Sequence, residues 1–131
     1  DLRTNKLLWS RPIGSARDTG PLGITSHLPI PMGMPMFGGA VTTRSGLLFI
    51  GATQDSTFRA FETATGRLLW SARLPAGGNA NPMTYTSRKT GRQYVLIYAG
   101  GHVLLRSKPG DAVIAYALPA SAPGAGSTTT N

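Results

Sequence analysis

The residue best suited to contact a ligand is His102, which follows Gly100 and Gly101 at the end of an apolar segment. Glycine lets the backbone approach a ligand closely, and a neutral imidazole donates one hydrogen bond and accepts another. We therefore predict a ligand contact at Gly101 and His102. The alternative is a histidine at the end of a strand whose hydrogen bonds go only to the backbone.

Further polar side chains lie beside expected strands. Asp55 comes just after the apolar run 47–51, and an aspartate in such a turn commonly caps backbone N–H groups. Asn79 and Asn81 occupy a Gly-Gly-Asn-Ala-Asn-Pro stretch ahead of another expected strand, and Asn81 is a candidate cofactor contact. These positions need a fold that gathers the strand ends in one place.

Several kinds of chemistry are excluded by what the sequence lacks. It contains no cysteine, so thiol nucleophiles, disulfides and thiolate metal sites are all ruled out. It has no pair of histidines four residues apart, no cluster of carboxylates and no glycine-rich phosphate loop ahead of a helix. We predict no metal site made by this chain alone.

The net charge of +8 comes from thirteen basic and five acidic residues, and the basic residues are scattered. Only Arg88 and Lys89 are adjacent, in an expected hairpin turn. The pattern favours an anionic membrane surface or an acidic small molecule over nucleic acid. Arg106 and Lys108 are candidates for binding an anionic ligand, with solvated loop charges as the commoner case, and we expect His27 to be exposed.

An internal repeat is the main clue to the fold. Residues 1–10 and 62–71 match at an offset of 61 residues, with five of ten positions identical, and both segments contain Leu-Leu-Trp-Ser. Asn5 in the first segment aligns with Gly66 in the second, and both residue types tolerate the positive φ of a tight turn. Repeats of this kind are typical of propellers and solenoids. We expect Trp9 and Trp70 to pack between neighbouring blades.

Short apolar or alternating segments separated by glycine turns predict an all-β chain of antiparallel strands. The first four expected strands are residues 39–43, 47–51, 57–62 and 67–73, followed by three more at 82–85, 92–98 and 111–118. An outer strand at 6–9 precedes them. The whole reads as a partial β-propeller of four-stranded blades, about one and three-quarter blades plus one outer strand.

Two segments stand outside this pattern. Residues 15–36 are rich in proline and glycine and show no periodicity, which predicts an inserted loop of the kind that often serves function. Residues 120–131 are small and polar, and we expect a disordered tail. The propeller part is thus predicted to span residues 1–119.

The repeated Thr-(Asn/Gly)-(Lys/Arg)-Leu-Leu-Trp segments resemble the tryptophan docking motif of pyrroloquinoline quinone (PQQ) dehydrogenases. Further segments resemble the membrane-bound glucose dehydrogenase group, whose relatives oxidise quinate, shikimate or polyols. They are Asp18–Gly23, Leu28–Pro35, Gly51–Asp55, Leu74–Gly78, Pro82–Tyr85 and Ala99–His102. The resemblance covers residues 1 to about 119 and is specific to the group, though not to one substrate.

The resemblance implies a periplasmic enzyme with an eight-bladed propeller and an N-terminal membrane anchor. PQQ and a Ca²⁺ or Mg²⁺ ion would lie on the propeller axis, and electrons from a sugar, polyol or cyclitol such as quinate would pass to ubiquinone. The main catalytic base and most cofactor and metal ligands would lie upstream of this chain. We therefore expect the chain alone to be inactive.

The family pattern also bears on single residues. It implies that His102 lies at the mouth of the axial site, with Gly101, and that Asp55 lies close to the active site; a turn aspartate stays the alternative for Asp55. The pattern often has Gly-Thr where this chain has Ala52-Thr53, a small departure. Relatives commonly carry Gln and Thr at positions 79 and 81, which weakens the ligand role of Asn81.

A second interpretation is a non-catalytic propeller scaffold built from similar repeats, which explains the tryptophan repeat but not the Ala-Gly-Gly-His segment or the proline-rich insert. A basic nucleic-acid-binding β domain has only the net charge in its favour. The expected partners are the polyhydroxy substrate, ubiquinone and the rest of the propeller. Open strand edges also predict that the isolated chain associates with itself.

Overall fold

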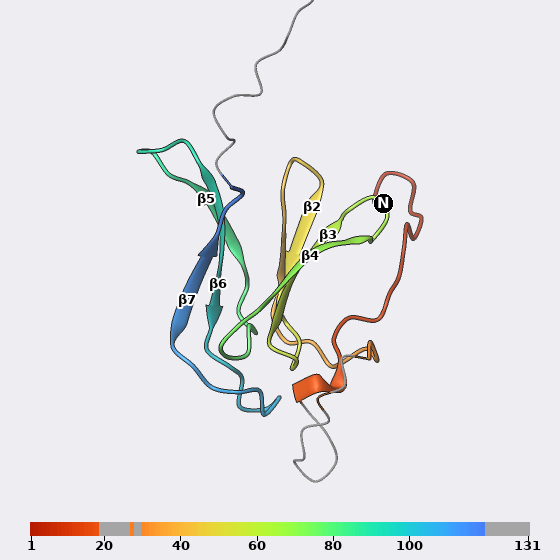
Figure 1. Cartoon of the computed structure of the whole chain (residues 1–131). Coiled ribbons are helices and arrows are strands. Elements are labelled where there is room, and N and C mark those ends of the chain that lie inside the picture. Colours follow the sequence, from red (N-terminus) through yellow and green to blue (C-terminus); the bar gives the residue numbers. More distant parts are fainter. Residues whose placement is uncertain (19–26, 28–29, 120–131) are drawn as a thin grey trace, which may run out of the picture.

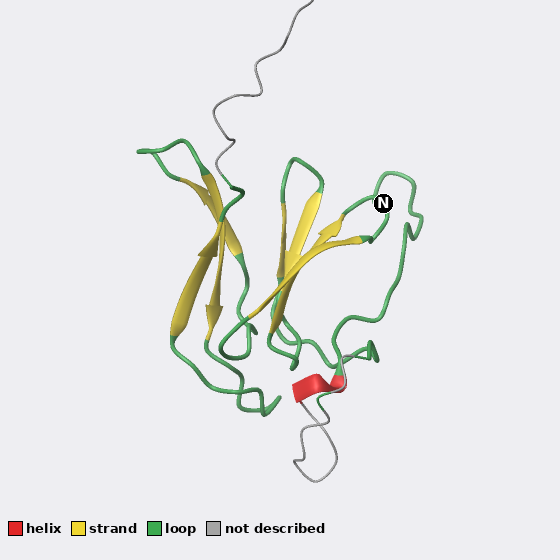
Figure 2. Cartoon of the chain, viewed as in Figure 1, coloured by secondary structure: helices red, strands yellow, loops and turns green. Residues whose placement is uncertain are grey.

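The computed structural model describes residues 1–18, 27 and 30–119, and it contains two antiparallel sheets (Figures 1 and 2). The first sheet has the order β1-β2-β3-β4 and the second has the order β5-β6-β7. The strands are β1 (Ala40–Thr42), β2 (Leu47–Ile50), β3 (Thr57–Glu62), β4 (Leu68–Arg73), β5 (Met83–Thr86), β6 (Gln93–Ala99) and β7 (Ala112–Tyr116). A 3₁₀ turn, η1 (Ala16–Asp18), is the helical element of the described residues.

The predicted all-β fold is confirmed, and each of the seven expected segments from residue 39 onward contains a strand. Glycine turns set the hairpins of the first sheet: Gly46 and Gly66 have φ of 81° and 70°, a region that side chains with a Cβ rarely adopt. A register shift at Ala60 and Phe61 adds a bulge between β3 and β4. The four-stranded and three-stranded sheets match the predicted full blade and incomplete blade.

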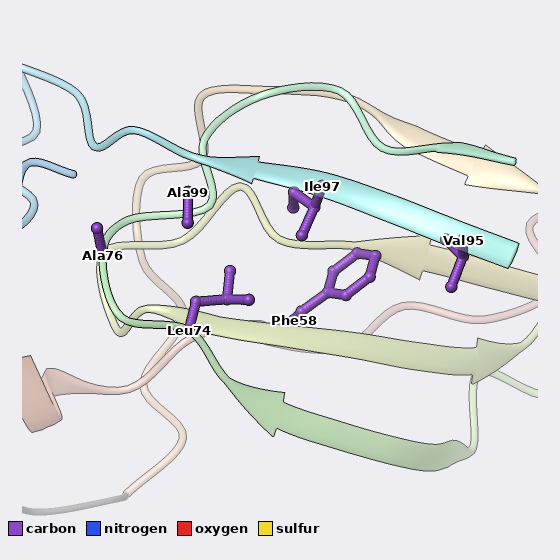
Figure 3. Packing of buried hydrophobic residues seen from close by; sticks show 6 residues of the cluster. All are labelled: Phe58, Leu74, Ala76, Val95, Ile97 and Ala99. Carbon is purple, nitrogen blue, oxygen red and sulfur yellow. The ribbon is translucent and has the colours of Figure 1, made fainter. Parts of the chain in front are cut away.

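The main core lies between the two sheets. Its buried members are Phe58, Leu74, Ala76, Val95, Ile97 and Ala99 (Figure 3). Side chains alternate across a strand, so β3 and β6 each direct one row of apolar side chains to this layer. Trp70 of β4 meets Tyr116 of β7 edge to face, with ring centroids 4.9 Å apart. The outermost strand of one sheet therefore packs on the next sheet.

The expected outer strand at residues 6–9 is wrong, because these residues join no ladder in the described structure. A strand needs a partner for its backbone groups, and no described strand pairs with this segment. The segment is held through side chains instead. The Trp9 indole N–H donates to the Thr63 carbonyl at 2.8 Å, and the ring lies 6.5 Å from that of Phe61.

The two ends of the sheets differ in character. The turns after β1, β3 and β5 are short hairpins at the upper end in Figure 1, beside the N-terminus. The connections after β2, β4 and β6 gather at the lower end, near η1. His102, Asp55 and the two asparagines belong to these lower connections, so the fold brings the sequence candidates to one end.

Parts of two predictions lie outside the described residues. These are the tail at 120–131 and most of the insert at 15–36, of which 19–26 and 28–29 are not described. The described ends of the insert meet in an antiparallel bridge between Ser15 and Pro31. No helix in the described residues has the length and apolar character needed to cross a bilayer.

Candidate functional site

Three connections at the lower end are joined by backbone hydrogen bonds. Ala52 N–H donates to the Gly78 carbonyl at 2.8 Å, and Gly101 N–H donates to the Gly77 carbonyl at 2.8 Å. Glycine is required where these segments cross, since a Cβ on Gly51 would lie 2.3 Å from the Gly78 oxygen. The connections thus form one continuous floor made largely of backbone.

His102 lies on the edge of this floor. Its ring stacks on that of Phe37 with centroids 5.1 Å apart and planes tilted by 30°. Its backbone N–H donates to Ser107 Oγ at 2.8 Å, and its carbonyl accepts from the Ser107 N–H at 3.3 Å. The imidazole Nδ1 is buried and has no hydrogen-bond partner among the described residues.

A small cavity of about 240 Å³ adjoins the ring. It is lined by Gly100, Gly101, His102, Val103, Ser107 and Pro109. Gly101 has φ of 76°, and a Cβ there would lie 2.5 Å from the Lys108 carbonyl oxygen. The predicted pair of Gly101 and His102 therefore does share one cavity wall.

Asn79 lies beside this group, whereas Asn81 does not. The Asn79 side chain accepts a 2.8 Å hydrogen bond from Ser107 Oγ and donates a longer one, at 3.4 Å, to the Phe37 carbonyl. Asn81 is exposed, and its side chain lies against Gly39, where a Cβ would be 2.6 Å from the amide oxygen. Asn79 is thus hydrogen-bonded to the residues around His102, whereas Asn81 lies apart from them.

Asp55 is completely buried and lines a different cavity, also about 240 Å³, with Arg59 and Ser15 among its walls. The carboxylate accepts hydrogen bonds from the Ser15 N–H at 2.9 Å and the Ser15 hydroxyl at 3.1 Å. Thr53 donates at 2.6 Å, and Arg59 forms a two-pronged ion pair with both oxygens. Both carboxylate oxygens are therefore engaged inside the protein.

Burial is the largest single effect on the pKa of Asp55 and would raise it. The hydrogen bonds from Arg59 and Thr53, the charge of Arg59 and the hydrogen bond from Ser15 act the other way, and together they hold the pKa below its ordinary value. Asp55 is thus an ionised carboxylate that fixes the start of the insert to the first sheet. The backbone N–H that its carboxylate caps is that of Ser15, 40 residues away, rather than one in its own turn.

The remaining candidates are less constrained. Arg106 is exposed, with φ of 49°, and Lys108 is exposed while its carbonyl accepts from the Gly77 N–H. His27 is exposed and donates its backbone N–H to Arg17. Within the described part of the chain, no group of three or more His, Cys, Asp or Glu side chains is arranged to hold a metal ion.

Two residues of the site, Phe37 and Ser107, could not be predicted from the sequence. Phe37 sits in a glycine-rich stretch with no periodicity, and Ser107 is one of many small polar loop residues. Their importance comes from contacts across long sequence separations, to His102 and Asn79, which no local pattern reports. Arg59 was also missed, because Asp55 lies in a turn and Ser56 has a φ of 46°, so strand alternation does not predict their contact.

Two adjacent antiparallel sheets with their long connections at one end define part of a β-propeller. Residues 1–95 match the family model described as "PQQ: Glucose/ethanol/alcohol dehydrogenase, beta-propeller domain". This match covers more than half of the chain, and the chain therefore belongs to this quinoprotein family.

Individual relatives agree with the family. The chain is 54% identical over 121 residues to a probable quinate dehydrogenase (quinone) of Xanthomonas campestris pv. juglandis, covering 91% of this chain and 15% of that protein. It is 50% identical over 120 residues to the quinate/shikimate dehydrogenase (quinone) of Acinetobacter baylyi, covering 90% and 14%. It is 48% identical over 119 residues to the quinoprotein glucose dehydrogenase of Escherichia coli, covering 91% and 15%.

Solved structures agree on the fold. The quinohemoprotein alcohol dehydrogenase from Comamonas testosteroni superposes with a TM-score of 0.54 and 28% sequence identity, over 67% of this chain and 14% of that one. The chain thus spans only about one seventh of the length of the proteins it matches.

Proposed function

We propose that the full-length protein containing this chain is a PQQ-dependent dehydrogenase that oxidises a sugar, polyol or cyclitol. The family membership and the relatives named for quinate, shikimate and glucose support the reaction and the substrate class. The single observation that carries the site is His102, a stacked imidazole with a buried, unpartnered Nδ1 beside a glycine-lined cavity.

The residues of this chain fit an oxygen-rich cofactor. The Nδ1 atom of His102 is buried without a partner, so we propose that the ring contacts a carboxylate, carbonyl or hydroxyl oxygen of the ligand through Nε2. Gly101 lines the same cavity and is proposed as a backbone contact, and Asn81 is proposed as an exposed further contact. When bound, PQQ supplies the two-electron redox chemistry.

We propose that the metal ion of the site, Ca²⁺ or Mg²⁺, has its ligands mainly outside this chain. Asp55 is proposed as a neighbour of the active site that holds the insert in place. Its engagement by Ser15, Thr53 and Arg59 supports this role over direct proton transfer. The main catalytic base is then expected in another part of the propeller.

The electron acceptor is proposed to be ubiquinone, since the names of two relatives include "(quinone)". We further propose a periplasmic location with an N-terminal membrane anchor in the full-length protein. The net charge of +8 supports a position against an anionic membrane surface.

The rest of the propeller is proposed to cover the outer face of the second sheet. That face exposes apolar side chains, namely Met83, Tyr85, Tyr98 and Val113. β7 also pairs on one side only, with β6. Unpaired strand edges and exposed apolar faces favour association, so the isolated chain is expected to be inactive and to associate with itself.

The test is a dye-reduction assay of the full-length protein with glucose, quinate, shikimate and glycerol, with and without PQQ and Ca²⁺. We expect a PQQ-dependent rate with at least one substrate, lowered strongly by His102→Ala. His27→Ala is the matched control, because it removes the other histidine of the chain, which is exposed. A protein that neither binds PQQ nor oxidises any of these substrates would favour the scaffold interpretation.

A further inference from the structure

Four residues around His102 form a closed circuit of contacts. Ser107 Oγ accepts from the His102 backbone N–H and donates to Asn79 Oδ1, both at 2.8 Å. Asn79 in turn reaches the Phe37 carbonyl at 3.4 Å, and the Phe37 ring stacks on the His102 imidazole. The circuit links three separate segments of the chain, and each link meets the next.

Ser107 and Asn79 are buried, with 8% and 9% of their surface exposed. Their polar atoms therefore have little access to water, and the hydrogen bonds between them are needed to satisfy both side chains. The hydroxyl of Ser107 makes one bond as acceptor and one as donor, which fixes the direction of its proton. The serine is thus set in one orientation by partners on both sides.

The backbone of Gly77 packs closely against this pair. A Cβ on Gly77 would lie 2.5 Å from Ser107 Oγ and 2.6 Å from Asn79 Oδ1. The turn from His102 to Ser107 is also held from below, where Gln54 Nε2 donates to the carbonyl of the buried Leu105 at 2.7 Å. His102 therefore sits on a turn that is fixed at both ends.

We infer that Ser107 and Asn79 are positioning residues, which hold the His102 imidazole so that its Nε2 contacts an oxygen of the bound ligand. The ring plane is set on one side by Phe37, and the backbone of His102 is set by Ser107. This inference rests on the proposed function, because it assumes that His102 contacts the cofactor or substrate. Neither Ser107 nor Asn79 needs to touch the ligand.

The test is a double-mutant cycle in the full-length protein, measuring kcat and KM for the best substrate and the dissociation constant of PQQ by titration. We expect Ser107→Ala to lower kcat/KM or PQQ affinity about 10- to 100-fold. In the His102→Ala background, the same substitution is expected to have an effect of less than about twofold, because its route of action is already lost. Ser107→Thr, which keeps the hydroxyl, is expected to restore most of the loss.

The matched control is Ser87→Ala, which removes a serine hydroxyl from the hairpin at the opposite end of the second sheet. If Ser107→Ala fails to fold, Asn79→Ala tests the same step from the other side. An equal loss in both backgrounds, or no loss in the wild-type background, overturns the inference while leaving the proposed function intact. A wild-type protein without PQQ binding, or an unaffected His102→Ala variant, overturns both.

Discussion

Replacing Asp55 with alanine is the sharpest test of how the lower end of the fold is held together. The substitution removes the acceptor of five hydrogen bonds and leaves the Arg59 guanidinium, whose side chain is only 13% exposed, without its counter-charge. Breaking one partner of a buried ion pair typically costs about 3–5 kcal/mol. We expect Asp55→Ala to lower the free energy of unfolding by about that amount.

The assay is urea denaturation of the chain, at one protein concentration for all variants because association changes the apparent stability, followed by the fluorescence of its two tryptophans. The control is Glu62→Ala at the end of β3, whose partly exposed carboxylate pairs with Arg67 and whose loss is expected to change little. Adding Arg59→Met to Asp55→Ala is expected to recover part of the stability, because no charge is then left buried. A double variant less stable than Asp55→Ala would refute the ion-pair reasoning.

The same carboxylate gives a pH dependence whose sign follows from its pKa. The pKa of Asp55 is lower in the folded protein than the value of about 3.9 in an unfolded chain. Its stabilising contribution is therefore complete above about pH 5 and is lost as the pH falls through the folded pKa. The difference in unfolding free energy between wild type and Asp55→Ala should shrink below about pH 4; a constant difference would contradict the assignment.

Three further predictions concern packing. Gly66→Ala should lower the free energy of unfolding by at least about 2 kcal/mol, because a Cβ there would lie 2.5 Å from the Trp9 ring. Gly91→Ala, with a similar positive φ and open space around it, should lower it by about 1 kcal/mol. Equal losses in urea titrations would refute the contact between Gly66 and Trp9. Trp70→Ala should cost about 2–3 kcal/mol in the same titrations, and a value near zero would show that this packing contributes no stability. Burial raises the pKa of Tyr116, so an ultraviolet titration should find a tyrosine that ionises above the ordinary range, and Trp70→Ala should lower that pKa by exposing the ring.

The strands could be predicted from the sequence because their signals are local. Glycines that adopt positive φ end the strands, and apolar alternation within each segment selects the buried face, as the pattern of β3 shows. Residues 6–9 carry the same local signal as β4 but form no strand. Pairing requires a neighbour, and a segment's own sequence does not report whether one is present.

The site could be predicted only in part, for a related reason. Gly101 and His102 could be proposed together because consecutive glycines before a histidine are visible in the sequence itself. Ser107 and Phe37 were missed because their roles depend on contacts with residues 28 to 65 positions away. Asp55 was identified as a candidate, but its hydrogen bonds with Ser15, 40 residues distant, appear only in the folded chain.

The contrast between Asp55 and His102 indicates where the chemistry of this end lies. Both are ionisable residues on connections at the same end, yet every oxygen of the Asp55 carboxylate has partners, whereas the Nδ1 of His102 has none among the described residues. A buried polar atom without a partner costs about 1–3 kcal/mol, and the packing of Phe37, Ser107 and Asn79 keeps the ring in place despite that cost. Such a local conflict with stability is expected at a functional site rather than in a structural one. The proposed ligand contact is made by Nε2, the other ring nitrogen, so the packing around Nδ1 acts by fixing the ring rather than by contacting the ligand.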